Sequence, residues 1–232
     1  MALLIGRGSG RERWDRGLRR DPRTYTPVSV SDLPISLPAD LAGRLASALD
    51  VEGKILRGLE ALGPVAGRDV LLVDGAASGV SAGLDGLGAR IRHEPAAAPF
   101  RTDMPAESID VVVGLWSAFR GVDAAELAEA DRVLRPEGRL LVVHDYGRDD
   151  VSRLLGDRPE YGAWSRRAGP FMTGGFRVRV LHCFWTFESP EATRAFLVDA
   201  FGAEGEAVAS TLKRPRLSYN VAIYHRSRGA PA

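Results

Sequence analysis

The chain has 232 residues, of which 45% are hydrophobic, enough to bury the core of one α/β domain with an additional N-terminal segment. Its formal net charge of +1 argues against a polyanionic partner for the whole molecule, so we expect no nucleic-acid partner. Cys183 is the sole cysteine, which excludes an internal disulfide and a cysteine-based metal cluster.

The composition also bears on where the protein works. The four histidines match no common zinc motif, so we expect no metal site. No apolar run approaches the ~20 residues of a membrane span, and the apolar start over residues 1–5 is too short for the core of a signal peptide. The sequence therefore predicts a cytoplasmic protein without membrane contact.

Residues 1–37 are expected to form an N-terminal arm that is partly flexible, because residues 1–24 hold seven arginines against three acidic residues. Residues 38–64 are expected to form a helical cap, with Asp40 as the residue that caps its first helix. Leucine and isoleucine recur there at helical spacing, at positions 41, 45, 49, 55, 56, 59 and 62.

The main domain is predicted over residues 65–226, followed by a tail over residues 227–232. Residues 70–73 are apolar and end at Asp74 and Gly75, which is typical of a buried parallel strand. Residues 75–79 are small, and residues 80–87 can be helical. A strand, a tight turn and a helix in this order bring backbone N–H groups and a helix N-terminus to a small polar ligand.

Strands and helices then alternate. Short or apolar strands are predicted over residues 88–94, 108–116 and 139–145, with a helix over 123–134 and an irregular, proline-containing stretch over 95–105. This alternation predicts a parallel sheet that is covered on both faces.

The last third changes character. Residues 149–167 have helical potential, residues 169–175 form a glycine-bearing loop, and strands are predicted over 176–187 and 217–225. Ser189 and Pro190 predict the start of the helix between these strands. We expect the two strands to close one edge of the sheet as an antiparallel pair, and we assign His182, Cys183 and Trp185 to the core.

The order of these elements resembles that of class I S-adenosylmethionine-dependent methyltransferases, over roughly residues 65–225. The resemblance rests on Pro99 and Phe100, on residues 109–113, and on residues 132–138, which read Arg-Val-Leu-Arg-Pro-Glu-Gly. It implies a Rossmann-like doubly wound, mostly parallel sheet, S-adenosylmethionine as cofactor and methyl transfer to a small-molecule acceptor.

The family's cofactor turn reads acid, any residue, Gly, any residue, Gly, any residue, Gly. This chain retains Gly75 and Gly79, has Val73 in place of the acid, and has Ala77 in place of the middle glycine. Asp74 is displaced by one residue and is expected to face the other side of the strand. The resemblance implies that Asp74, Gly75, Ala77 and Gly79 contact the cofactor.

The adenosine end of the site departs from the family as well. Only 34 residues lie between Gly75 and Asp110, fewer than in the family, so one strand–helix unit is trimmed or missing. Glu94 matches either the family's adenine-binding acid, in which case Pro95 supplies no N–H group, or the acid that binds the ribose hydroxyls. Trp116 stacks on adenine or on an aromatic acceptor, or else packs in the core.

Ligands of open α/β sheets sit beyond the carboxyl ends of the strands, which singles out Trp116 and Ser117, and then His144, Asp145 and Tyr146, as candidate catalytic or binding positions. His144 has the ordinary pKa of a base, although a histidine at a strand end also serves structural roles. The alternative function is a catalytically degenerate member of the fold that serves as a binding or scaffolding subunit for a protein partner. The oligomeric state stays open, with a homodimer among the options.

Overall fold

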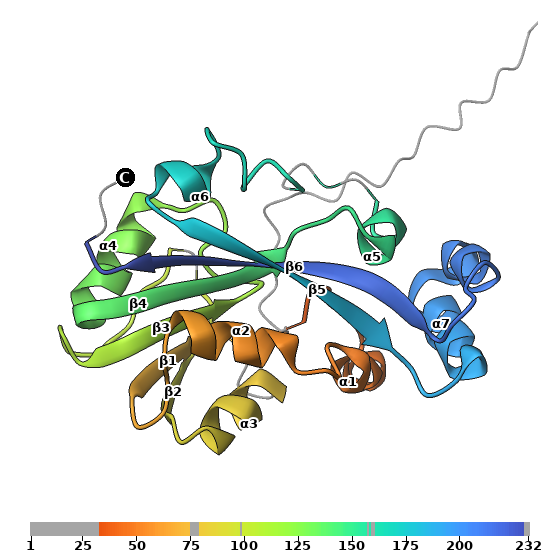
Figure 1. The fold of residues 1–232 in the computed structure, drawn as a ribbon, viewed down its shortest axis with the longest axis horizontal. Coiled ribbons are helices and arrows are strands. Elements are labelled where there is room, and N and C mark those ends of the chain that lie inside the picture. Colours follow the sequence, from red (N-terminus) through yellow and green to blue (C-terminus); the bar gives the residue numbers. More distant parts are fainter. Residues whose placement is uncertain (1–32, 75–78, 98, 157, 159–160, 230–232) are drawn as a thin grey trace, which may run out of the picture.

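The computed structural model describes residues 33–74, 79–97, 99–156, 158 and 161–229. In this part of the chain six strands form one sheet, in the order β2-β1-β3-β4-β6-β5 (Figure 1). The strands are β1 (Asp69–Val73), β2 (Arg90–Glu94), β3 (Ile109–Leu115), β4 (Leu134–Asp145), β5 (Arg177–Thr186) and β6 (Arg216–Ser227). Strands β1 to β4 are parallel, whereas β6 is antiparallel to both of its neighbours, so the predicted fold class is confirmed.

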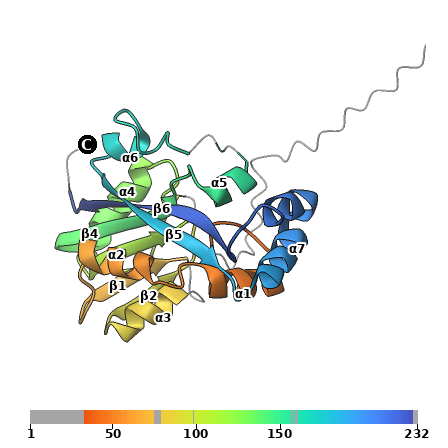
Figure 2. The ribbon, with the colours of Figure 1, turned by 45° about the vertical axis from the view of Figure 1, so that its right-hand side comes forward.

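Helices lie on both faces of this sheet (Figures 1 and 2). The helices are α1 (Ala39–Ala48), α2 (Lys54–Leu62), α3 (Gly79–Gly86), α4 (Ala124–Val133), α5 (Asp150–Leu154), α6 (Pro170–Thr173) and α7 (Pro190–Ala209). Helices α1, α2 and α3 share one apolar core with one face of the sheet, while α4 and α6 pack on the opposite face.

Strand β4 shows why the central strands read as unbroken apolar runs. Leu141 and Val143 pack on the side of α1 and α2, whereas Leu140 and Val142 pack on the side of α4. All four side chains are fully buried. A parallel strand with helices on both faces needs apolar side chains at every position, because neither face meets water.

The outer elements differ from the expectation in four places. Helix α1 begins after Pro38, and Asp40 lies in its first turn without capping it. The expected helical stretch over 149–167 contains the short α5, and the expected loop at 169–175 contains α6. Helix α7 continues past Gly202 to Ala209, with a kink at Gly202 (φ 61°, ψ −132°). The cap by Ser189 is confirmed, since its hydroxyl accepts a hydrogen bond from the Ala192 N–H at 3.1 Å.

The shortened middle of the chain contains a single strand. Among the described residues, β2 is the sole strand between β1 and β3, and it forms one edge of the sheet. The sequence then runs without a helix or strand from residue 95 to residue 108, leaving aside Ala98. In the described part of the chain, β2 therefore has a free outer edge.

Among the helices of the described segments, none is both long and apolar enough to cross a membrane. Both polar and apolar side chains line the seven helices, in keeping with their position against one sheet.

An ion cluster joins the amino ends of the central strands. Arg135 Nη1 lies 2.9 Å from Asp69 Oδ2 and 2.8 Å from Asp110 Oδ2, and Arg90 Nε lies 2.8 Å from Asp69 Oδ1. The hydrogen bond from Arg90, with a further one from Arg135, lowers the pKa of Asp69 to about 2 from its ordinary 3.8. The carboxylate of Asp69 therefore stabilises the fold above about pH 4, and this stabilisation is lost as the pH falls through 2.

We expect Asp69→Asn to lower the free energy of unfolding at neutral pH by about 1 kcal/mol, because the cluster is part-exposed and screened. The difference from the unsubstituted protein should shrink as the pH falls from 4 to 2. Urea unfolding followed by circular dichroism at several pH values measures both effects. Asp103→Asn, at an exposed carboxylate, is the control; an equal loss in both variants would contradict the role of the cluster.

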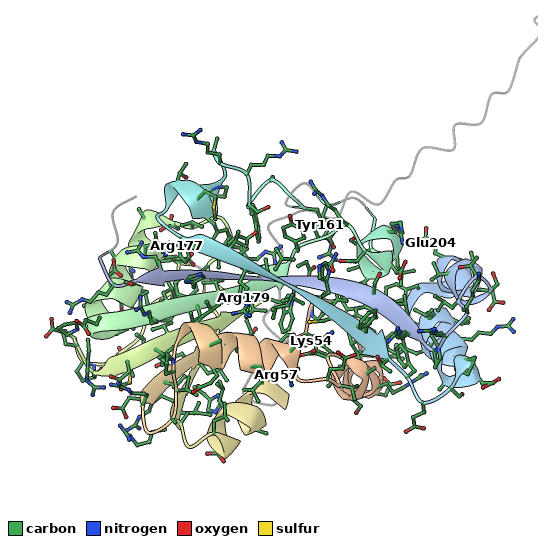
Figure 3. The ribbon with its side chains drawn as sticks, in the orientation of Figure 1. Lys54, Arg57, Tyr161, Arg177, Arg179 and Glu204 are labelled. Carbon is green, nitrogen blue, oxygen red and sulfur yellow. The ribbon has the colours of Figure 1, made fainter. Side chains whose placement is uncertain are left out.

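The edge strand β5 carries exposed arginines. Arg177 and Arg179 are exposed on β5 (Figure 3), which pairs on one side with β6. Near the other end of β5, a bridge from Leu49 to Trp185 covers the free edge. Charged side chains on an unpaired edge disfavour pairing with another chain.

We expect the double variant Arg177→Val, Arg179→Val to aggregate more readily during refolding at micromolar concentration, because its edge becomes an apolar β-strand template. Light scattering during dilution from denaturant measures this. The double variant Arg166→Val, Arg167→Val removes two exposed arginines outside the sheet and should refold like the original chain. Equal scattering from both double variants would show that net charge, and not the edge, controls aggregation.

Candidate functional site

Asp74 joins the carboxyl ends of three neighbouring strands. It follows β1 with a positive φ of 62°, a region that aspartate tolerates better than bulkier residues. Its N–H donates to the carbonyl of Glu94 at the end of β2, at 2.7 Å. Its Oδ2 accepts a hydrogen bond from the hydroxyl of Ser117, two residues after β3. One residue thus fixes the positions at which β1, β2 and β3 end.

Glu94 is the last residue of β2 and lies beside Val73 in the register of the sheet. This places Glu94 at the end of the strand next to β1, which is the position that the resemblance connects with the ribose hydroxyls. The hydroxyl of Thr102 donates to Glu94 Oε1 at 2.7 Å. The carboxylate is half-buried at the open edge of the sheet.

Gly79 is the first residue of α3. A Cβ built at Gly79 would meet no atom within 4 Å. A cavity of about 170 Å³ lies there, between α2, α3 and the end of β3. Its lining is mostly apolar: Leu33, Ala46, Leu49, Asp50, Gly53, Ile55, Leu56, Gly79, Val80 and Trp116.

A larger cavity of about 510 Å³ lies on the other flank of α1, towards α7, and Arg44, Asp40 and Glu188 are among its lining residues. Arg44 is engaged there by Asp199 at 2.7 Å. None of the residues predicted as site residues lines this space, so its size alone does not make it the candidate site.

Trp116 begins a buried hydrogen-bonded chain at the carboxyl edge. It is 4% exposed, and its Nε1 donates to the hydroxyl oxygen of Tyr219 at 2.8 Å. The Tyr219 hydroxyl in turn donates to Asp145 Oδ1 at the end of β4. The chain connects the cavity wall at Trp116 with the carboxylate of Asp145.

Asp145 has a mixed electrostatic environment. Its side chain is 11% exposed, and Arg158 Nη1 lies 3.7 Å from Oδ2. The Tyr161 hydroxyl donates to the same oxygen at 3.5 Å from the segment between α5 and α6 (Figure 3). Burial raises the pKa of Asp145, and the hydrogen bond from Tyr219 and the charge of Arg158 oppose this shift. Burial also raises the pKa of Tyr219 well above its ordinary value, so Tyr219 stays protonated as the donor to Asp145.

His144 lies on the opposite face of β4 from Asp145, because successive residues of a strand alternate in direction. Its ring is 1% exposed and packs against Trp164 at 4.8 Å and Phe171 at 5.8 Å between ring centroids. Burial, with a smaller contribution from Arg120, lowers the pKa of His144 to about 3.

Backbone groups of Trp116 and Ala118 lie near the His144 ring and offset part of this pKa shift. Neither ring nitrogen, however, makes a hydrogen bond of acceptable geometry within the described segments. Tyr146 also packs with the core on this face, and its N–H donates to the carbonyl of Asn220 at 2.9 Å. The structure thus brings Asp145 together with Trp116, and it places His144 and Tyr146 in the other core.

Two of the predicted cofactor contacts, Gly75 and Ala77, lie outside the described residues. In the described part of the chain, no group of three or more histidine, cysteine or carboxylate side chains could hold a metal ion. Cys183 and Trp185 are buried as expected, whereas His182 is exposed, because it faces the other side of β5.

Two residues of the site were missed by the sequence analysis: Thr102 and Tyr219. Ser117 was predicted together with Trp116 at the end of its strand, whereas Thr102 lies in a stretch without a helix or strand. The partner of Tyr219 is 74 residues away in sequence, at Asp145. Alternation along residues 217–225 does predict that Tyr219 faces the core, but the register of β6 decides which side chain it meets.

Comparison with solved structures finds similar folds. A proposed type II methyltransferase from Anaeromyxobacter dehalogenans is 21% identical, with 77% of this chain and 97% of that chain covered and a TM-score of 0.48. A proposed methyltransferase from an antibiotic biosynthesis pathway of Anabaena variabilis is 11% identical, with 77% and 98% covered and a TM-score of 0.47. An S-adenosylmethionine-dependent methyltransferase from Aquifex aeolicus is 16% identical, with 82% and 98% covered and a TM-score of 0.46.

No family model matches the chain, and no curated protein matches it. Identities of 11–21% with TM-scores below 0.5 leave the chemistry of this chain to its own site residues.

We expect His144→Phe to make the protein less sensitive to acid. Folding lowers the pKa of His144 from its ordinary 6.5 to about 3. The unfolded chain therefore binds a proton at this histidine below about pH 6.5, whereas the folded chain does so only below about pH 3. This difference costs about 2 kcal/mol of stability between about pH 6.5 and about pH 5, and phenylalanine removes it.

Urea unfolding at these two pH values measures the effect of His144→Phe. His93→Gln changes an exposed histidine on β2 and serves as the control. The same dependence of stability on pH in His144→Phe and in the unsubstituted chain would contradict a buried neutral His144.

Proposed function

We propose that the chain binds S-adenosylmethionine at the carboxyl edge of β1, β2 and β3 and transfers its methyl group to a small-molecule acceptor. The observation that carries this proposal is the junction at Asp74, which gathers three parallel strand ends beside a helix N-terminus and an apolar cavity. In open α/β sheets, ligands bind outside the carboxyl ends of the strands.

The residues present fit the two chemically different ends of this cofactor. At one end, the carboxylate of Glu94 suits a ribose diol, since it accepts hydrogen bonds and Thr102 engages Oε1. At the other end, the N-terminus of α3 at Gly79 favours a carboxylate, because the first N–H groups of a helix lack partners within the helix.

The cavity would hold part of the cofactor. Its volume of about 170 Å³ is below the ~300–1,000 Å³ typical of sites that enclose a drug-sized ligand. Its apolar wall, with Trp116 and Val80, suits the aliphatic and aromatic surface of the molecule and excludes water from it. The remainder would lie along the sheet edge towards Glu94.

Methyl transfer requires few catalytic groups from the protein. When bound, S-adenosylmethionine supplies a methyl group that is activated by its sulfonium for in-line displacement. Alignment of the acceptor and exclusion of water then provide much of the acceleration. We propose Asp145, whose pKa is raised and which is joined to Trp116 of the cavity wall through Tyr219, as the group that takes a proton from an acceptor whose attacking atom carries one. We do not assign this role to His144, because its buried imidazole is a weak base on the other face of the sheet.

A second function is a binding or scaffolding subunit without methyl transfer. It is favoured by the carboxylate of Asp74, which is engaged by Ser117, and by Pro95, which offers no N–H group after Glu94. The two functions are separated by incubating the protein with S-adenosylmethionine and a panel of small amines, phenols and carboxylic acids. Release of S-adenosylhomocysteine with one acceptor supports the first function; cofactor binding without turnover across a broad panel favours the second.

We expect calorimetry to show binding of S-adenosylmethionine, and Glu94→Gln to weaken this binding about tenfold to a hundredfold, because hydrogen bonds to a charged group are lost. Glu107→Gln is the matched control, since Glu107 lies on the surface and pairs with Arg228 at 2.8 Å. The absence of any heat or thermal shift at millimolar cofactor would overturn the proposed function. Equal affinity in both variants would remove Glu94 from the site.

A further inference from the structure

The loop that follows β2 is held in place by side chains of α4, although it has no regular structure itself. Glu126 Oε1 accepts from the Phe100 N–H at 3.1 Å, and Glu126 is buried. Arg101 donates from the other direction, to the carbonyl of Ala125 at 2.9 Å. The first half of the loop is thus attached to the N-terminal turn of α4.

The second half of the loop is attached one turn further along α4, with Thr102 at its centre. Glu129 Oε1 accepts from the Thr102 N–H at 3.2 Å, while Arg132 donates to the Thr102 carbonyl at 3.1 Å. Arg132 also donates to the carbonyl of Met104 at 2.9 Å. Glu129 and Arg132 are themselves paired through two hydrogen bonds, so both backbone groups of Thr102 are held by a preformed ion pair.

The hydroxyl of Thr102 has a defined direction. It accepts from the Met104 N–H at 3.2 Å, so its own hydrogen is free to be donated to Glu94 Oε1, at 2.7 Å. Within the described residues, this hydroxyl is the sole hydrogen-bond donor to the carboxylate of Glu94. Glu94 itself ends a strand that forms one edge of the sheet among the described residues.

We infer that Thr102 is a positioning residue that orients the carboxylate of Glu94 towards a vicinal diol, and that it thereby sets the preference of the site for a ribose over a 2′-deoxyribose. This inference rests on the proposed function. Because one oxygen of Glu94 is occupied by Thr102, the other oxygen is presented in a fixed direction. The loop and α4 take over the support that a neighbouring strand would give to this edge.

The probes for the test are S-adenosylhomocysteine and its 2′-deoxyribose analogue, with dissociation constants measured by calorimetry. For the unsubstituted protein we expect the ribose form to bind about tenfold more tightly, since a hydrogen bond to a charged group is at stake. Thr102→Val should weaken the ribose form several-fold and leave the deoxy form nearly unchanged. Thr102→Ser keeps the hydroxyl and should restore the preference.

Two further variants separate positioning from a general loss of structure. Thr173→Val removes a threonine hydroxyl that bonds to the backbone of α6, outside the site, and should not change the preference. In a Glu94→Gln background, Thr102→Val should add little, because Thr102 acts through the carboxylate. The valine variant keeps both backbone groups of residue 102, so its melting temperature should stay close to that of Thr102→Ser.

The outcomes are distinguishable. An unsubstituted protein that binds neither probe would overturn the proposed function and this inference with it. Binding of both probes with an unchanged preference in Thr102→Val would overturn the inference alone. Full additivity of Thr102→Val and Glu94→Gln would likewise show that Thr102 does not act through Glu94.

Discussion

The hydrogen bonds of Asp74 are the constraint on which the candidate site depends. A parallel sheet aligns strands along their length, but the chain leaves each strand in its own direction. Asp74 counters this divergence with a backbone bond to β2 and a side-chain bond to Ser117 beyond β3. Its φ is positive, at 62°. Trp116, with a φ of 34°, leaves β3 in a similarly rare conformation, and such conformations persist where surrounding contacts hold them.

Among the described residues, β2 forms one edge of the sheet. Its last residue, Glu94, would be free to move if nothing lay beside it. Side chains of α4 hold the loop that follows β2, through the Glu129–Arg132 pair and the buried Glu126. Burial raises the pKa of Glu126, because a buried carboxylate loses its contacts with water. The hydrogen bond from the Phe100 N–H offsets part of this desolvation penalty. The stability of α4 and the geometry of the sheet edge are therefore coupled.

Most of the fold could be predicted from local sequence patterns. The apolar runs before Asp74, Trp116 and Tyr146 are central strands because a strand buried on both faces admits little else, and the helix start at Ser189 follows from short-range capping chemistry. The contacts within the candidate site could not be predicted from such local patterns. The bonds from Trp116 to Tyr219 and from Ser117 to Asp74 join residues 103 and 43 positions apart, so they depend on the register of the sheet and not on any local pattern.

The alternation along β4 then decides which neighbours can act together. His144, Asp145 and Tyr146 are consecutive in sequence, and the end of a parallel strand is the right place for all three. On an extended strand, however, Asp145 faces the core of α1 and α2, while His144 faces the aromatic cluster of Trp164 and Phe171. The cavity lies at Trp116, on the side of Asp145, and Tyr219 connects the two through hydrogen bonds. The imidazole, although chemically the more obvious base, is separated from the cavity by the sheet itself.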